Sequence, residues 1–314
     1  MHWPGGPGTN LQLDGVARDL LTPGEGEPAV VAEGSMAVTV GTGRVIEDIT
    51  VTPESFSIGD LLGAQGGSRL RDAVDAAAAA EREAGTPLYL LLDDIPGATL
   101  IAGFAWSRWR DVLARHFAAN GGPNHLARQA AAARGRKMEG ICAGFRPGSS
   151  SLAPGGFLNT ELDQNVAIVP PIADADDPIG WHDMPAHPAI AMRRARRIDV
   201  FLDGPEAGID AMFRDSTWGP DGTEVAVHEY HIDARADVAS GTLTAVVAEP
   251  RVLPYSECPA AAANAGRMVG AEMAGLRAEV LSRLRGTDSC THLNDALRSL
   301  AEVPVLLAQI LQPG

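Results

Sequence analysis

The sequence predicts an α+β fold made by tandem duplication, in which an antiparallel β-meander followed by helices occurs twice and forms a pseudo-dimer. Two observations predict it. Short motifs recur at a nearly constant offset, and in both copies the strand-like stretches precede the helix-like ones. Strands first and helices second is the order typical of α+β folds, whereas strands and helices alternate in a parallel-sheet fold.

The repeat is clearest at two pairs of aspartates. Asp19 matches Asp215 at an offset of 196 residues (215 − 19), and the arginines before them match as well. Asp94 matches Asp295 at an offset of 201 residues (295 − 94), which predicts a short insertion between the two points. Self-similarity at such a long period indicates a repeat of whole supersecondary units.

In the first copy, β-branched residues cluster between Gly and Pro turns, which predicts strands at 11–20, 30–40 and 45–51. Apolar residues at helical spacing and a run of alanines predict a helix over 58–83. A last apolar element begins at Pro87.

The second copy repeats this order. Its strands and helices are expected, in turn, at 198–202, 209–215, 224–237, 242–252, 260–268 and 273–284, followed by a final helix that opens at Cys290.

We therefore divide the chain into three parts. Residues 1–110 are a degenerate first repeat, and residues 191–314 are the second repeat, which carries the Cys/His residues. Residues 111–190 are a long connecting segment, expected to line a pocket because connections of this length are seldom plain linkers.

Composition limits the class of partner. The chain has 314 residues, is 45% hydrophobic and carries a net charge of −15, so we expect small-molecule ligands and neither nucleic acid nor an anionic membrane. No apolar run reaches the ~20 residues that span a bilayer, and the N-terminal residues are too rich in Gly and Pro for a signal peptide, which predicts a cytoplasmic protein. The sequence does not predict an oligomeric state.

Four side chains of the second copy are candidate metal ligands: His228, Cys258, Cys290 and His292. Strand alternation puts His228 on the apolar face with Tyr230, and Cys258 lies in a turn between a strand and a helix. Cys290 and His292 can face one ion only if Cys290 lies at or before the helix cap. Each cysteine, taken alone, could instead be a buried core residue.

Two thiols and two imidazoles suit a borderline-soft divalent ion, with zinc the first choice and iron the second. The chain has no Cys-x-x-Cys, so the fold must assemble such a site. Asp295, Asp215 and Cys290 are the candidate catalytic residues: the two carboxylates would orient an imidazole or act as general base, and the thiol would be a nucleophile.

The first copy lacks this chemistry. Tyr89 stands in the place of Cys290, and Leu91 stands in the place of His292. The first copy is therefore expected to keep the packing of the element and to bind no ion.

The second copy resembles a bacterial domain family of unknown function that is marked by a terminal Cys-Thr-His-Leu, here residues 290–293. It also has a distant similarity to the NifU-type iron–sulfur cluster scaffold fold, in which His228 falls on a ligand aspartate and Cys258 on a ligand cysteine. Ala226 replaces the scaffold's first cysteine, and this departure puts cluster assembly in doubt.

These observations favour a metal-dependent enzyme, a lyase or hydrolase of a small metabolite. Two alternatives stay open. One is a metal or iron–sulfur carrier without turnover, and the other is a metal-free hydrolase with a Cys-His nucleophile pair.

Overall fold

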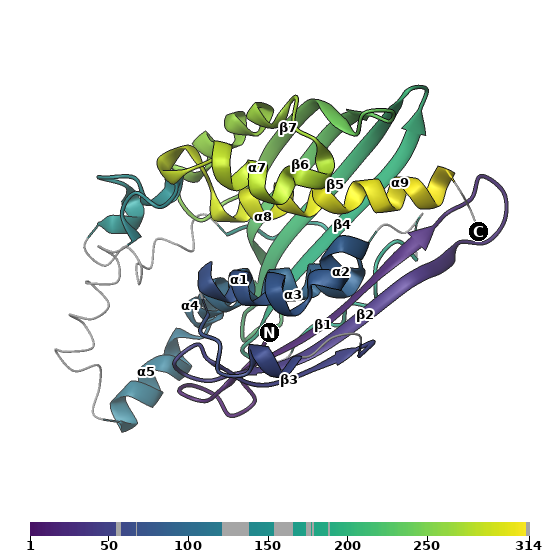
Figure 1. Cartoon of the computed structure of the whole chain (residues 1–314). Helices are drawn as coiled ribbons and strands as arrows, with labels where there is room; N and C mark the ends of the chain where they lie inside the picture. Colours follow the sequence, from purple (N-terminus) through teal and green to yellow (C-terminus); the bar gives the residue numbers. More distant parts are fainter. Residues whose placement is uncertain are drawn as a thin grey trace. The chain divides into compact units, whose positions relative to one another are not determined.

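The computed structural model describes residues 1–54, 58–66, 68–120, 138–153, 166–173, 177, 179–187 and 189–311. Within these residues it has two antiparallel sheets, of three and four strands, each followed along the chain by helices (Figure 1). The predicted α+β order of a meander followed by helices, occurring twice, is confirmed.

Contacts divide the chain into two compact units. Unit 1 comprises Met1–Gly103, Pro170–Ala191 and Ala301–Gly314, and unit 2 comprises Phe104–Val169 and Met192–Leu300. The division of the chain after residues 110 and 190 stays a prediction.

The sheet of unit 1 has the order β1-β2-β3. Its strands are β1 (Leu11–Leu21), β2 (Ala29–Val40) and β3 (Ile46–Thr52). The apolar helix α3 (Pro87–Ile101) packs on β1 and β2, and its N-terminus is capped by the Thr86 hydroxyl, which accepts from the backbone N–H of Tyr89 at 3.2 Å.

The single helix expected over 58–83 was wrong. The structure has η1 (Ile58–Leu61), α1 (Ser68–Ala77) and α2 (Ala79–Ala84) instead. Gly63 has a φ of 80°, which a right-handed helix does not admit, and Ala78 interrupts the helix again at φ −114°, ψ 36°.

One described helical stretch, Pro87–Arg108, is long and apolar enough to cross a membrane by length and composition, with a mean hydropathy of 1.4. In this structure 67% of the most apolar 18-residue window of that stretch is buried, as in the core helix of a globular protein.

The sheet of unit 2 has the order β4-β5-β6-β7. Its strands are β4 (Met192–Asp203), β5 (Glu206–Trp218), β6 (Glu224–Asp237) and β7 (Thr242–Val252). The helix η6 (Cys258–Met268) packs on β7, and α8 (Thr291–Ser299) packs on β5, β6 and η6.

The remaining helices complete the two units. They are η2 (Ala102–Phe104), α4 (Ala105–Arg108), α5 (Arg110–Ala119), η3 (Ala143–Phe145), η4 (Ser150–Leu152), η7 (Met273–Gly275), α7 (Leu276–Arg283), η8 (Gly286–Asp288), η9 (Leu300–Glu302) and α9 (Val303–Leu311). Within unit 2, η3 packs against η6 and η8.

Equivalent strands of the two sheets are paired in the same register, which is the strongest structural sign of the duplication. Arg18 pairs across the strands with Glu33 in unit 1, and Arg214 pairs with Glu229 in unit 2. Both members of the second pair lie 196 residues after those of the first, and in each sheet the register shifts after the residue that follows the arginine.

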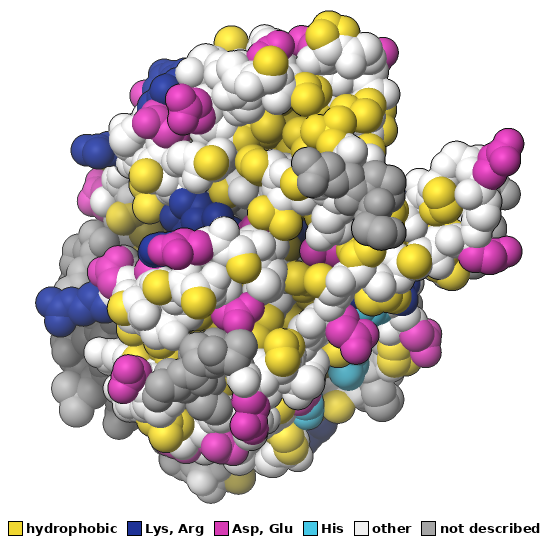
Figure 2. Space-filling model, turned by 45° about the vertical axis from the view of Figure 1, so that its right-hand side comes forward, with side chains coloured by type: hydrophobic (Ala, Val, Ile, Leu, Met, Phe, Trp, Pro, Cys, Tyr) yellow, Lys and Arg dark blue, Asp and Glu magenta, His cyan; other side chains and the backbone are white. Residues whose placement is uncertain are grey.

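Acidic side chains are scattered over the face shown in Figure 2 and do not gather in one patch. This distribution fits the net charge of −15 and gives no single acidic surface on that face.

Candidate metal centre

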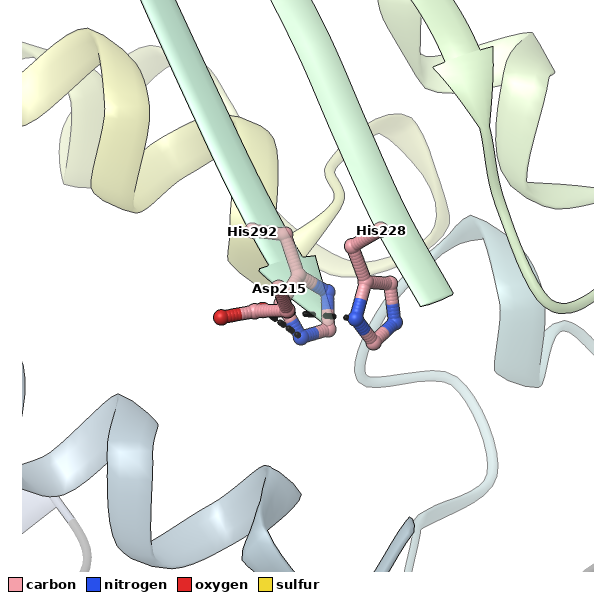
Figure 3. A group of neighbouring side chains, drawn as sticks. All are labelled: Asp215, His228 and His292. Atoms are coloured by element: carbon pink, nitrogen blue, oxygen red, sulfur yellow. Dashed lines mark ion pairs between the residues drawn. The ribbon is translucent and has the colours of Figure 1, made fainter. Parts of the chain in front are cut away.

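Three side chains from separate elements of unit 2 meet at the candidate site: Asp215 from β5, His228 from β6 and His292 from α8 (Figure 3). One potential ligand atom from each lies within 4.8 Å of the other two. The register of β5 and β6 sets Asp215 directly opposite His228, and α8 begins one residue before His292. Strand pairing and a helix start therefore place the group.

Asp215 and His228 are buried, and His292 is largely so. Asp215 is fully buried, His228 is 2% exposed and the side chain of His292 is 12% exposed. The Asp215 Oδ2 atom lies 3.3 Å from His228 Nδ1 and 3.9 Å from His292 Nε2. The two imidazole rings are stacked, with centroids 3.4 Å apart and planes at 18°.

Both imidazole nitrogens that face Asp215 lack a hydrogen bond of good geometry. His228 Nδ1 and His292 Nε2 are buried side-chain atoms that make no hydrogen bond of good geometry, and Asp215 is the polar group that both of them face. Buried polar atoms are nearly always satisfied, so two orphan nitrogens beside one carboxylate need an explanation. A cation bound among the three atoms would provide it.

Arg194 of β4 holds the carboxylate from the other side. Its Nε donates to Asp215 Oδ1 at 2.9 Å and its Nη2 donates to Oδ2 at 3.1 Å. Burial by itself would raise the pKa of Asp215, but the charge of Arg194 and the hydrogen bonds to the carboxylate outweigh it, so the pKa lies well below its ordinary value. Asp215 is therefore ionised.

The imidazoles are held in the neutral form. Burial lowers the pKa of His228, and burial together with the neighbouring His228 ring lowers the pKa of His292 well below its ordinary value. Neutral imidazole is the form that binds metal ions, so the environment prepares both rings as ligands.

Aromatic rings enclose the group. Phe104 meets His228 edge-on with centroids 5.6 Å apart, and the Phe213 ring lies 6.3 Å from that of His292. The guanidinium groups of Arg194 and Arg196 lie over Phe213 at 4.9 and 5.4 Å. These rings lower the local polarity, which strengthens electrostatic interactions in the site.

Two further predicted residues adjoin the group. Cys290 is the N-cap of α8, which is the position that Cys290 must have if it and His292 are to face one ion. Its Sγ lies 3.9 Å from His292 Nδ1. Asp295 Oδ2 accepts from Arg194 Nη1 at 3.4 Å, and the backbone oxygen of Asp295 accepts from Arg196. Cys290 thus lies next to the His292 ring, and Asp295 is linked to Asp215 through Arg194.

Cys258 lies in a different group, which we call the thiol cluster: Cys142, Cys258 and Cys290 with the ring of Tyr230. All three cysteines are free and buried. Burial raises the pKa of each thiol, that of Cys142 to about 11, and the charges of neighbouring thiols raise the pKa of Cys142 and Cys258 further. Of the four predicted ligands, His228 and His292 thus lie together beside Asp215, whereas Cys258 and Cys290 belong to the thiol cluster.

The sequence did not single out Arg194. It lies in the arginine-rich run 193–197, and its side chain is only 6% exposed. The missing signal was the register: β4 pairs Arg194 with Asp215, and that pairing follows from aligning the β4–β5 hairpin about its turn.

Unit 1 has a different pair of residues at the positions equivalent to Asp215 and His228. Asp19 is the counterpart of Asp215, and it pairs across β1 and β2 with Ala32, the counterpart of His228. Burial raises the pKa of Asp19 to about 6. The carboxylate is therefore kept in unit 1 without the imidazole opposite it.

Comparison with known families gives one match. Residues 192–306 match the family described as protein of unknown function (DUF2889). The matched range covers β4 to β7, η6, α7 and α8, and so includes Asp215, His228 and His292. The predicted resemblance to a domain family of unknown function is confirmed over this range, whereas the likeness to iron–sulfur scaffolds stays a prediction. No curated protein and no solved structure matches the chain.

Proposed function

We propose that this protein is a metal-dependent enzyme, a lyase or hydrolase of a small metabolite, in which Asp215, His228 and His292 hold the ion. The single observation that carries the proposal is the convergence of two buried imidazole nitrogens, neither with a hydrogen bond of good geometry, on an ionised carboxylate within 4.8 Å. Zinc is the expected ion, and iron is the second choice, because two imidazoles and one carboxylate suit both.

Three protein ligands leave a coordination position open for water or substrate, which is typical of catalytic rather than structural zinc sites. Zinc bound there would lower the pKa of a coordinated water and polarise a substrate oxygen. Arg194 would fix the direction of the Asp215 carboxylate, which retains lone pairs beyond those that accept from the guanidinium. Asp295, held by Arg194, would serve as orienting group or general base.

Metal content tests the ligand set. We expect one zinc per chain bound at this site in the purified wild type and its loss in His228→Ala and in His292→Ala. His231→Ala is the matched control, because His231 lies on the same strand with its side chain 24% exposed and its Nε2 3.1 Å from Asp210. Equal zinc in wild type and folded His228→Ala, measured by elemental analysis, would overturn the proposal.

Turnover separates an enzyme from a carrier. A panel of esters, lactones and amides should show activity that a chelator removes and added zinc restores, because a catalytic ion must be present for each cycle. If the protein instead gives up its ion to a competing apoprotein at a useful rate and no substrate is turned over, the carrier alternative holds.

One observation favours a second candidate, a metal-free Cys-His hydrolase. Cys290 Sγ lies 3.9 Å from His292 Nδ1, and His292 Nε2 lies 3.9 Å from Asp215 Oδ2, which is the order of a nucleophile, a base and an orienting acid. Burial raises the pKa of Cys290 and so disfavours the reactive thiolate. Selective labelling of Cys290 by iodoacetamide, with chelator-resistant activity, would establish this candidate.

A further inference from the structure

The thiol cluster is a second group of potential ligands in unit 2, and the proposed function does not use it as a site. Its three cysteines come from three elements: Cys142 precedes η3, Cys258 begins η6 and Cys290 caps α8. They are 7%, 6% and 3% exposed. Three thiols from distant parts of the chain thus lie near enough to influence one another's pKa.

A buried hydroxyl faces the cluster. Tyr230 is fully buried, and its hydroxyl interacts electrostatically with all three cysteines. The hydroxyl makes no hydrogen bond of good geometry, and the Cys290 sulfur is its candidate partner. A negatively charged sulfur would be a stronger acceptor for this hydroxyl than a neutral thiol.

The backbone around the cluster is also fitted to the sulfur atoms. A Cβ atom on Gly144 would lie 2.6 Å from Cys258 Sγ and 4.0 Å from Cys142 Sγ, so the absence of a side chain there leaves room for both. The backbone N–H groups of Gly144 and Phe145 lie near the sulfur of Cys142 and lower the pKa of its thiol, and the Phe145 N–H donates to the Cys142 carbonyl oxygen at 3.0 Å. N–H groups close to a sulfur stabilise a thiolate that binds a metal.

We propose that Cys142, Cys258 and Cys290 form a second metal site, which takes a thiophilic divalent ion of the zinc class as a tris-thiolate. Each thiol releases its proton to solvent as its sulfur binds the ion, so three protons leave for each divalent ion bound. The product carries one net negative charge, which the N–H groups at Cys142 and the Tyr230 hydroxyl stabilise. This proposal has its own ligand set and does not rest on the proposed function.

A divalent ion suits the cluster better than a monovalent one, since it leaves less negative charge in a buried place. Among the described residues only Asp215, His228 and His292 have three ligand atoms within 4.8 Å, so the sulfurs must close on the ion by rotation about their Cα–Cβ bonds. A cavity of about 330 Å³ is lined in part by Tyr255, Ser256 and Pro259, which flank Cys258 in the sequence.

Cobalt(II) is the probe that separates the two sites. It replaces zinc and absorbs in the near ultraviolet only where thiolates bind it. We expect this thiolate-to-cobalt band when Co²⁺ is added to the reduced apoprotein, and its retention in His228→Ala. We expect its intensity to fall by at least a third in Cys142→Ser and in Cys258→Ser, because each variant removes one of three thiolates.

Zinc analysis of the same proteins gives a second readout. The wild type should bind two zinc ions per chain, and His228→Ala and Cys142→Ser should each bind one. Circular dichroism and urea unfolding establish that each variant is folded. Absence of the band from wild type, or an undiminished band in folded Cys142→Ser, would overturn the proposal. Retention of the band with no zinc at the imidazoles would overturn only the proposed function.

Discussion

Arg194 should be one of the residues on which the fold of unit 2 depends most. Replacing it with Gln removes both hydrogen bonds, of 2.9 and 3.1 Å, that hold the fully buried carboxylate of Asp215. Breaking a buried ion pair in this way typically costs 3–5 kcal/mol, because the remaining charge is left without compensation. We expect Arg194→Gln to lower the free energy of unfolding, measured in urea on the metal-free protein, by about this amount.

The control is an exposed pair with the same kind of contact. Arg267 Nη1 lies 3.0 Å from Asp288 Oδ2, but the two side chains are 47% and 57% exposed. Arg267→Gln should therefore change the free energy of unfolding by only about 0–1 kcal/mol. The double variant Arg194→Gln/Asp215→Asn should recover part of the loss, since it also removes the buried charge. An effect of Arg194→Gln no larger than that of Arg267→Gln would refute the reasoning.

Two further predictions concern stability. Burial raises the pKa of Asp19 from 3.8 to about 6, so its carboxylate disfavours the fold most above pH 6, and the penalty shrinks as the pH falls from about 6 towards 4. Asp19→Asn should accordingly stabilise the protein by about 1–2 kcal/mol at pH 8 and by nearly nothing at pH 4, and a gain in urea unfolding that does not change with pH would contradict this. Gly144→Ala should cost about 1–3 kcal/mol, because its Cβ would meet Cys258 Sγ at 2.6 Å. Gly103→Ala, where a Cβ meets nothing within 4 Å, should be close to neutral in thermal unfolding, and equal melting temperatures for the two variants would rule out the steric account.

Much of the fold could be predicted from the sequence because the duplication repeats its hydrophobic pattern. Alternation and turn residues predicted the strands of both sheets, and the 196-residue offset matches the paired register of Arg18 with Glu33 and of Arg214 with Glu229. The interruptions near Gly63 and Ala78 were not predicted, since helical spacing of apolar residues continues across short breaks.

The candidate site could be predicted only in part. Strand alternation placed His228 on the buried face. The close spacing of a cysteine, a histidine and an aspartate at the start of the final helix of the second copy singled out His292. The spacing of residues in the sequence does not give distances between elements, and on spacing alone Cys258 was grouped with the imidazoles. The sequence also gave no reason to place Arg194 against Asp215. Cys142 was not singled out within the segment 111–190, because its neighbours in space are far away in sequence.

Anomalous diffraction at the zinc edge, from crystals of the wild-type protein grown with zinc, tests the central claim most directly. The proposed site predicts a peak about 2.0–2.2 Å from one nitrogen of His228, one nitrogen of His292 and one oxygen of Asp215. Crystals in which the two imidazoles remain stacked beside Asp215 with no anomalous peak between them would contradict it.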